Sequence, residues 1–327
     1  MEHRRLGKTG RNVSVIGFGA WAIGGDWGAQ DDVTSLKALH AAADAGVDLI
    51  DTADVYGDGH SERLIGRFLR ERPGETFFVA TKMGRRVPQV PGNYRPDAFR
   101  AWNDRSRENL GVDTLDLVQL HCPPTQVYYT PEVFAALDEM VAEGRIRNYG
   151  VSVEKVEEAL KAIEFPGVAS VQIIFNMLRQ RPAERFLAEA ARRDVGVLAR
   201  VPLASGILTG KLRADSSFDA TDHRAYNRNG EAFDRGETFA GVDYATGLQV
   251  ADALRDLVPQ GATMAQMALR WILMHEGITT TIPGAKTPEQ AMANAAAGDL
   301  APLPPATMER IRDLYDARVR PLVHQRW

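Results

Sequence analysis

Short apolar runs alternate with amphipathic segments along almost the whole 327-residue chain, and this alternation restricts the fold more than any other feature. The runs of strand length lie at 15–20, 48–53, 77–82, 116–121, 146–151, 170–175, 196–202 and 279–283. The segments with helical periodicity between them lie at 33–45, 61–71, 96–109, 131–143, 154–164, 183–193 and 247–275. Strict alternation of strands and helices, without a break in composition, favours one closed (β/α)8 barrel over an open sheet. We therefore expect a single α/β TIM-barrel domain over residues 1–327.

The segments outside this alternation complete the expected fold. Turn residues between two short alternating runs in 3–15 predict an N-terminal β-hairpin. The helical segment 247–275 is interrupted by a turn that begins at Pro259. Two more helices are expected after the last strand, at 287–297 and 305–318. Residues 203–245 lack periodicity, and because this long loop leaves the end of the seventh strand, we expect a lid or clamp over the active face.

The composition excludes several classes of partner. The chain has 39 basic and 43 acidic residues and no block of like charge, so neither nucleic acid nor an anionic membrane is an expected partner. Its single cysteine, Cys122, excludes an internal disulfide and is typical of a reducing compartment. The sequence shows neither the apolar core of a signal peptide nor an apolar run long enough to span a bilayer. We expect a cytoplasmic protein, and the composition leaves its oligomeric state open.

Four reactive side chains lie where three predicted strands end. Asp51, Lys82 and His121 close separate apolar runs, and Tyr56 lies in the loop after the first. They converge only if the strands are parallel, because the carboxyl ends of parallel strands share the edge where α/β proteins form active sites. An ammonium within hydrogen-bonding distance lowers the pKa of a phenol from its ordinary value of about 10, and a carboxylate keeps that lysine in place. An imidazole opposite can hold a carbonyl oxygen, so the pattern predicts an enzyme with a proton-donor site.

A competing motif follows the first predicted strand. The run GFGAWA, which begins at Gly17, matches the G-x-G-x-x-A dinucleotide pattern. A Rossmann fold would require a helix to begin there at once, yet turn formers continue and a helix is predicted only after Asp31. We therefore interpret the glycines as making room for Trp21 and Trp27 over the mouth of a barrel.

Other polar residues receive structural interpretations. Asp54 is interpreted as a loop or cap residue, and Cys122 as a buried thiol rather than a nucleophile. The histidines other than His121 show no metal-ligand spacing, so no metal is expected.

The sequence resembles the aldo-keto reductase family. The matching motifs are DTADVYG (51–57), ATK (80–82), LVQLH (117–121), GVS (150–152), VQIIFN (171–176), VPLASGILTGK (201–211) and IPGAKTPEQAMAN (282–294). They cover nearly the whole chain in the family's order, which argues against a purely structural role for the four strand-end residues. The resemblance implies NADP(H)-dependent interconversion of an aldehyde or ketone and its alcohol, with Asp51, Tyr56, Lys82 and His121 as the catalytic residues. The details are most similar to the bacterial branch with inositol-operon oxidoreductases and sugar or glycerol dehydrogenases.

The resemblance also implies which residues bind the nicotinamide. Ser152 and Gln172 are expected to hydrogen-bond its carboxamide, with Asn176 in support. Many members stack a tyrosine on the ring where this chain has Arg200, whose planar guanidinium can also stack.

The rest of the cofactor is expected to bind two further segments. The segment from Pro202 should wrap the pyrophosphate through residues Leu203, Gly206, Leu208 and Lys211. The segment from Gly284 should meet the 2′-phosphate with Lys286, at the amino terminus of a helix that favours an anion. Gln290 stands where the family often has an arginine, which leaves NAD(H) open as a second cofactor. Asn294 is expected to contact the adenine.

The substrate pocket is expected to have aromatic walls. They are Trp21, Trp27, Tyr128 and Tyr129. Such walls suit small hydroxy-aldehydes and sugars as well as apolar aldehydes, so the sequence predicts no more than a carbonyl and alcohol pair. The alternative function is a nucleotide-binding regulatory subunit, because potassium-channel β subunits use the same fold.

Overall fold

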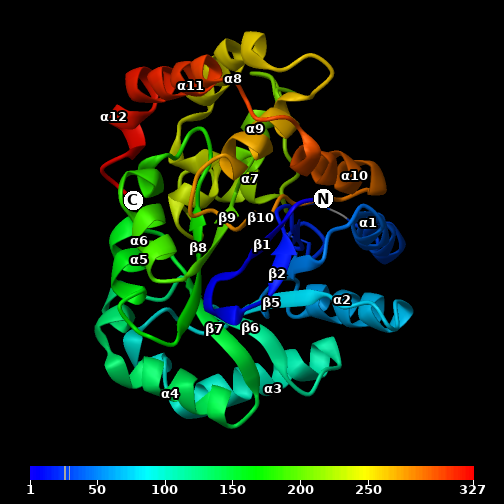
Figure 1. Cartoon of the computed structure of the whole chain (residues 1–327), viewed down its shortest axis with the longest axis vertical. Coiled ribbons are helices and arrows are strands. Elements are labelled where there is room, and N and C mark those ends of the chain that lie inside the picture. The colour runs from blue at the N-terminus through cyan, green and yellow to red at the C-terminus, as the bar shows by residue number, and fades with distance from the viewer. Residues whose placement is uncertain (26, 29) are drawn as a thin grey trace.

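A computed structural model describes residues 1–25, 27, 28 and 30–327, and their centre is a parallel sheet closed into a barrel (Figure 1). Its strands are β3 (Phe18–Gly19), β4 (Leu49–Asp51), β5 (Phe78–Met83), β6 (Leu115–His121), β7 (Ile146–Ser152), β8 (Val168–Ile174), β9 (Gly196–Arg200) and β10 (Thr280–Thr281). Each strand pairs in parallel with the next one along the chain. Parallel bridges from Ile16 to Thr281 and from Gly19 to Gly284 join the first strand to the last. The expected (β/α)8 barrel is confirmed.

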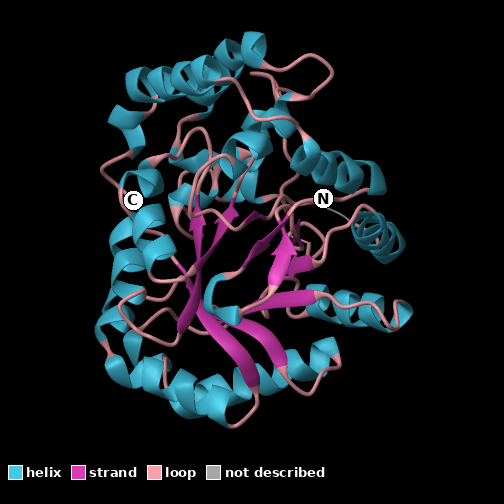
Figure 2. Cartoon of the chain, viewed as in Figure 1, coloured by secondary structure: helices cyan, strands magenta, loops and turns pink. Residues whose placement is uncertain are grey.

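Helices cover the outside of this barrel (Figure 2). They are α1 (Asp32–Asp44), α2 (His60–Glu71), α3 (Pro96–Leu110), α4 (Pro131–Ala142), α5 (Val156–Ala162), α6 (Phe186–Arg192), α8 (Tyr244–Leu254), α9 (Met264–Leu273), α10 (Pro288–Ala295), α11 (Pro305–Arg318) and α12 (Arg320–Val323). The short helix α7 (His223–Tyr226) lies instead within the segment 203–245. Polar caps fix where several of the helices begin: the Asp31 carboxylate accepts the Thr34 N–H at 2.8 Å and starts α1. The apolar face of α2 buries Leu64, Ile65 and Phe68 against the strands.

Apolar side chains fill the amino-terminal end of the barrel. The predicted hairpin is present as β1 (His3–Arg5) and β2 (Asn12–Ser14), paired antiparallel. It places Leu6 and Val13 in a fully buried cluster with inward-facing side chains of the barrel strands. These are Leu49, Phe78, Ala80, Leu117, Leu198 and Ile282. Because this end is packed with hydrocarbon, the polar inward-facing residues lie towards the carboxyl ends of the strands.

The structure corrects some expected boundaries. The first and last barrel strands, predicted at 15–20 and 279–283, are only two residues long, because these segments pair with each other mainly through isolated bridges. The predicted interruption of segment 247–275 at Pro259 is confirmed, since α8 ends at Leu254 and α9 begins only at Met264, with Thr263 and Gln266 capping each other. The segment 203–245 is more regular than expected, since it contains α7 and several 3-10 turns.

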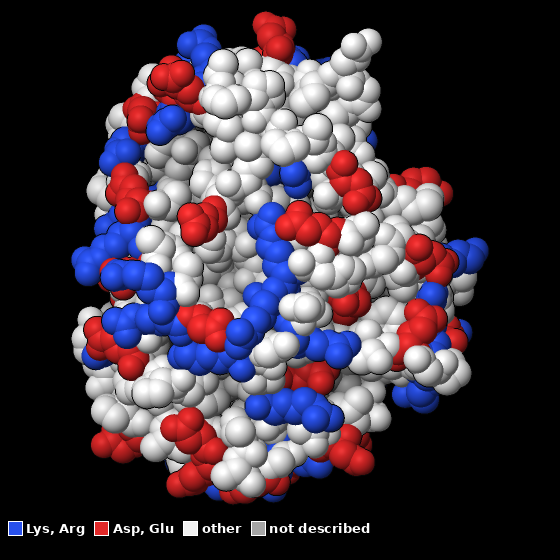
Figure 3. Space-filling model, in the orientation of Figure 1, with Lys and Arg blue, Asp and Glu red and all other residues white. Residues whose placement is uncertain are grey.

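Charged side chains of both signs lie over the face shown in Figure 3, and the Lys and Arg side chains gather in a band near its middle. No described helix is both long and apolar enough to cross a membrane.

Gly150 on β7 tests how tightly the barrel interior is packed. A Cβ at this position would lie 2.5 Å from the backbone carbonyl oxygen of Ser170 on β8, which cannot move without breaking the strand pairing. We expect Gly150→Ala to lower the free energy of unfolding by about 1–3 kcal/mol, measured by urea denaturation. Gly92→Ala is the matched control, because its Cβ would enter open space. Equal stability of the two variants would contradict the packing argument.

Candidate active site

The predicted catalytic residues meet at the carboxyl ends of β4, β5 and β6. The Lys82 ammonium donates to the Asp51 carboxylate at 2.6 Å and to the Tyr56 hydroxyl at 3.3 Å. Its third hydrogen bond goes to the Thr52 carbonyl oxygen at 2.8 Å. Lys82 and Asp51 are 1% and 3% exposed, so this is a buried ion pair whose three donors are all used.

Burial dominates the ionisation of the phenol. Burial raises the pKa of the Tyr56 hydroxyl above its ordinary value, and the Lys82 ammonium is the main influence in the opposite direction. The expected effect of the lysine is therefore present, but without a ligand it does not bring the pKa of Tyr56 below the ordinary value. Burial would lower the pKa of Lys82, yet Asp51 and Tyr56 outweigh it and keep the ammonium charged.

His121 faces the phenol across the site. Its ring centroid lies 5.9 Å from that of Tyr56, and the two rings are nearly perpendicular. Burial lowers the pKa of His121 well below its usual value, and the cations Arg85 and Lys82 lower it further. The imidazole is therefore neutral at pH 7 and can donate a hydrogen bond without carrying charge.

Gln172 and Asn176 are engaged within the protein. The Gln172 amide nitrogen donates one N–H to the second carboxylate oxygen of Asp51 at 2.7 Å, which leaves its other N–H and its amide oxygen to meet a ligand. The Asn176 side chain donates to the Val201 carbonyl oxygen and accepts from Leu178 N–H, both at 2.8 Å. Asn176 thus holds the turn that follows β9.

Arg200 is part of an ion pair that sequence reasoning missed. Its guanidinium contacts the Glu237 carboxylate at 2.5 Å and donates to the Val153 carbonyl oxygen at 2.9 Å. Both charged side chains are buried, and the charge of Glu237 helps to raise the pKa of Arg200 against the effect of burial. No spacing in the sequence indicates the pair, because Glu237 lies within the irregular segment 203–245.

A second charged pair lies beside His121. Arg85, in the loop after β5, donates to the Glu154 carboxylate at 3.0 Å. Burial, and then the negative charge of Asp234, raises the pKa of Glu154 to about 7. Sequence reasoning missed this pair as well, and the arginine that follows the lysine strand was the one available signal.

The segment expected to bind the pyrophosphate folds back on itself. The N–H groups of Gly206 and Leu208 donate to the Leu203 carbonyl oxygen at 2.9 and 3.1 Å. Left-handed backbone at Ala204 and Ser205 produces this turn. In this conformation both N–H groups are used within the turn, whereas Lys211 is exposed.

The residues expected at the 2′-phosphate gather around the start of α10. The Thr287 hydroxyl caps the helix, and the Gln290 amide oxygen accepts Lys286 N–H at 2.8 Å. The Lys286 ammonium is half-buried and donates to the Trp27 carbonyl oxygen. Asn294 donates to the Gly284 carbonyl oxygen at 3.1 Å.

Two of the four predicted aromatic walls lie beside the phenol. The Trp21 ring stacks on that of Tyr56 at a centroid distance of 6.0 Å, and Trp27 packs edge-on against Trp21 at 5.5 Å. The other two differ from the expectation of a wall. Tyr128 is fully buried and donates to the backbone carbonyl oxygen of Ser152 at 3.3 Å. Tyr129 is 63% exposed and its ring lies against the Lys161 ammonium of α5.

The structure also locates the GFGAWA run, Cys122 and Asp54, which were given other interpretations from the sequence. The helix after the GFGAWA run begins at Asp32, so the context that a Rossmann motif needs is missing. Cys122 is buried beside the Ser152 hydroxyl, with 3.5 Å between sulfur and oxygen. Asp54 lies in the loop after β4, in line with its interpretation as a loop residue, and its buried carboxyl oxygens have no hydrogen-bond partner among the described residues.

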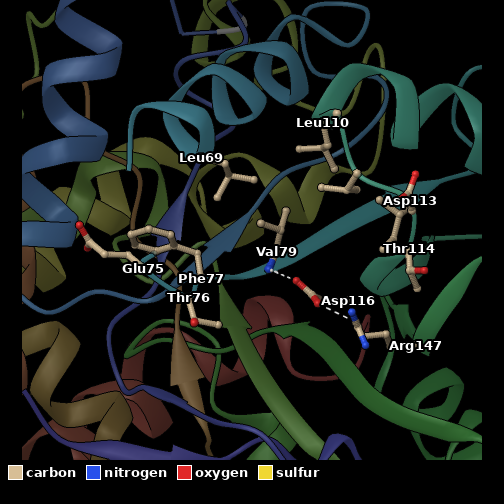
Figure 4. Close-up of a pocket in the computed structure, with 13 residues that line it drawn as sticks. Leu69, Glu75, Thr76, Phe77, Val79, Leu110, Asp113, Thr114, Asp116 and Arg147 are labelled. Atoms are coloured by element: carbon tan, nitrogen blue, oxygen red, sulfur yellow. Dashed lines mark hydrogen bonds and ion pairs between the residues drawn. The ribbon is translucent and has the colours of Figure 1, made fainter. Parts of the chain in front are cut away.

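A pocket at the opposite edge of the sheet lies away from these residues (Figure 4). Its walls include Phe77 and Val79 at the start of β5 and Leu110 at the end of α3. The Asp116 carboxylate accepts Val79 N–H at 3.1 Å and contacts the Arg147 guanidinium at 3.4 Å. We interpret this pocket as structural, because barrel enzymes place their active sites at the carboxyl-terminal face.

Comparison with known proteins identifies relatives along the whole chain. A sequence model of the Aldo/keto reductase family matches residues 15–316. The NADH-specific methylglyoxal reductase of Escherichia coli (strain K12) is 30% identical, over 89% of this chain and 92% of that protein. The solved structure of a glycerol dehydrogenase from Gluconobacter oxydans is 30% identical, with a TM-score of 0.79 over 97% of this chain and 96% of the other. A probable voltage-gated potassium channel subunit beta of Arabidopsis thaliana is 28% identical, over 97% of this chain and 98% of that protein.

The buried Asp54 carboxyl should make the free energy of unfolding depend on pH. Burial, and then the charge of Glu62, raises the pKa of Asp54 to about 7, whereas an unfolded aspartate ionises near about 3.9. Between these values the folded protein keeps a proton that the unfolded chain loses, so the free energy of unfolding falls as the pH rises through this window. The cost at pH 8 is up to about 4 kcal/mol.

We expect Asp54→Asn to remove this pH dependence and to stabilise the protein at pH 8 more than at pH 5.5. Urea denaturation at both pH values measures the change, with the exposed Asp313→Asn as control. A wild-type pH slope that persists in Asp54→Asn would rule out this carboxyl as its source.

Proposed function

The chain belongs to the Aldo/keto reductase family of oxidoreductases, and we propose that it interconverts a small aldehyde or ketone and its alcohol with NADP(H). The observation that supports this most is the single ammonium of Lys82, which contacts both Asp51 and the Tyr56 hydroxyl. An ion pair serving only stability would not need a phenol as its third partner.

Each member of the tetrad has a separate task in this proposal. Tyr56 donates its proton to the carbonyl oxygen of the substrate, and Lys82 stabilises the phenolate that remains. Asp51 holds the ammonium, and the neutral imidazole of His121 donates a hydrogen bond that keeps the carbonyl oxygen near the phenol. The bound cofactor supplies the hydride from its nicotinamide C4.

The side chains around the barrel mouth fit such a cofactor. The Arg200 guanidinium is planar and is held in its plane by Glu237 and the Val153 carbonyl oxygen, so it would offer a fixed plane on which the nicotinamide can stack. Ser152 and Gln172 would bind the carboxamide, supported by Asn176. At the other end, the Lys286 ammonium beside the amino terminus of α10 suits a phosphate.

The remaining cofactor contacts are assigned by segment. Pro202 to Lys211 would hold the pyrophosphate, with Leu203 N–H as the donor that the turn of Gly206 and Leu208 does not use. Gln290 and Asn294 would lie near the adenosine, together with the backbone at Gly284.

The pocket walls support a small oxygen-rich substrate. Trp21 and Trp27 provide an apolar side, and the Arg85–Glu154 pair provides a donor and an acceptor near His121. Relatives named for methylglyoxal and for glycerol act on compounds of this kind. The alternative, a nucleotide-binding regulatory subunit, is supported by the Arabidopsis relative. Turnover of glyceraldehyde, followed by NADPH absorbance, distinguishes the two.

Tyr56→Phe tests the proton donor. We expect kcat to fall by about 10²–10⁴-fold, because the positioned acid is lost, while the Kd for NADPH stays within about twofold. Steady-state kinetics and fluorescence titration measure the two values. Tyr129→Phe is the control, since this tyrosine is exposed. Retention of most activity in Tyr56→Phe would remove the phenol from its role.

Lys286→Ala tests cofactor choice. We expect it to weaken NADPH by about 10- to 100-fold and NADH much less, because only NADPH carries the 2′-phosphate. Gln290→Arg should shift the preference towards NADPH by adding a cation on the first turn of α10. Both cofactors are titrated by quenching of tryptophan fluorescence. Equal losses for NADPH and NADH in Lys286→Ala would reassign the cofactor, with NAD(H) as the first candidate.

A further inference from the structure

Trp327 is inserted against the irregular segment 234–241, far from its own place in the sequence. Its indole N–H lies 3.0 and 3.2 Å from the two Asp234 carboxylate oxygens, to which it donates. The Trp327 carbonyl oxygen accepts a hydrogen bond from Arg181 at 2.5 Å. The side chain is 6% exposed, so the contact is a buried one.

The surface that receives the indole is shaped for it. A Cβ on Gly241 would lie 2.5 Å from the Trp327 ring, and one on Gly236 would lie 3.2 Å from it. On the other side, the Arg179 guanidinium lies 3.8 Å from the ring centroid. Arg179 is 2% exposed, and none of its side-chain nitrogens donates a hydrogen bond within the described residues. The ring face and the nearby Asp234 are therefore the main compensation for this buried charge.

The segment held by Trp327 carries the partner of Arg200. Glu237 lies three residues after Asp234, and its carboxylate contacts the Arg200 guanidinium at 2.5 Å. The Ser205 hydroxyl donates to the Glu237 carbonyl oxygen at 3.0 Å and accepts Phe239 N–H at 3.1 Å. The indole thus contacts the segment at both ends, at Asp234 and Gly241, while Ser205 joins its middle to the turn after β9.

We infer that Trp327 is a positioning residue that holds Glu237 against Arg200 and so fixes the guanidinium plane on which the nicotinamide stacks. This inference rests on the proposed function for the stacking role of Arg200, but the contact between Trp327 and segment 234–241 does not. Without the indole, segment 234–241 would lose a buried hydrogen bond and a ring contact. Glu237 would then be free to leave Arg200 for solvent.

Trp327→Ala tests the inference. We expect the Kd for NADPH to rise by about tenfold, with a smaller change in kcat, because the acid and its lysine are untouched. Trp327→Phe, which keeps a ring but loses the N–H, should give an intermediate Kd and guards against a variant that does not fold. Gln325→Ala is the control, since this neighbour is exposed and its side-chain amide donates to the Pro321 carbonyl oxygen at 3.3 Å.

A double-mutant cycle with Glu237→Gln separates positioning from general stability. If Trp327 acts through Glu237, the Trp327→Ala substitution should raise Kd little further in the Glu237→Gln background. Additive effects of the two substitutions, or a lower Tm with unchanged Kd, would overturn the inference.

Hydrogen exchange in the cofactor-free protein tests the positioning role of Trp327 separately from the proposed function. We expect the backbone amides of 234–241 to exchange faster in Trp327→Ala than in wild type, whether or not NADPH binds. Unchanged exchange would overturn the positioning role of Trp327. Absence of NADPH binding in wild type would instead overturn the proposed function.

Discussion

The rest of the site depends on one buried ammonium group. Lys82 has three N–H bonds, and the chain provides three acceptors for them: the Asp51 carboxylate, the Thr52 carbonyl oxygen and the Tyr56 hydroxyl. An ion buried without partners costs several kcal/mol, so all three acceptors must stay in place. Because two of them belong to the end of β4 and the third to the loop that follows, the requirement fixes how this loop leaves the barrel. The Tyr56 hydroxyl is therefore held in place as the third hydrogen-bond acceptor of the Lys82 ammonium.

Asp51 also makes a buried hydrogen bond outside the pair with Lys82. Its second carboxylate oxygen accepts from Gln172, which lies across the barrel on β8. The polar layer therefore connects opposite sides of the barrel mouth, while the apolar cluster of Leu49, Phe78 and Leu117 closes the other end. Stability at one end and chemistry at the other are thus built from successive inward-facing positions on the same strands.

The residues that were predictable from the sequence are those at strand ends. A buried strand has the sequence of an apolar run, and a polar residue that closes the run, such as Lys82 or His121, must lie at the edge of the sheet. The helix start after Asp31 was predictable for a similar reason, because a cap has a local signal. The strands β3 and β10 were overestimated, since apolar sequence continues where the pairing is reduced to single bridges.

The rest could not be predicted because the signal is not local. Glu237 reaches Arg200 from 37 positions along the chain, with no periodicity to indicate it. Tyr128 and Tyr129 are adjacent and chemically equal, yet one is buried and the other exposed, which depends on the direction of a single turn. The N–H groups of Gly206 and Leu208 donate to a backbone carbonyl oxygen of the same turn, because the backbone at Ala204 and Ser205 is left-handed. Alanine and serine rarely adopt this conformation, so the sequence does not indicate the turn.

Segment 203–245 is ordered mainly by side chains that bind backbone rather than by long helices. The Asn227 amide oxygen accepts the N–H groups of Ala232 and Phe233 at 2.8 and 2.9 Å. Phe233 in turn packs 6.1 Å from Trp21, which stacks on the Tyr56 ring. Ile207, Leu208 and Phe239 of the same segment are buried in the hydrophobic core, so opening the whole segment would expose apolar surface as well as hydrogen-bonding groups. The part held by Asn227 would exchange only a few hydrogen bonds for water, so we expect this part to move first when a ligand enters.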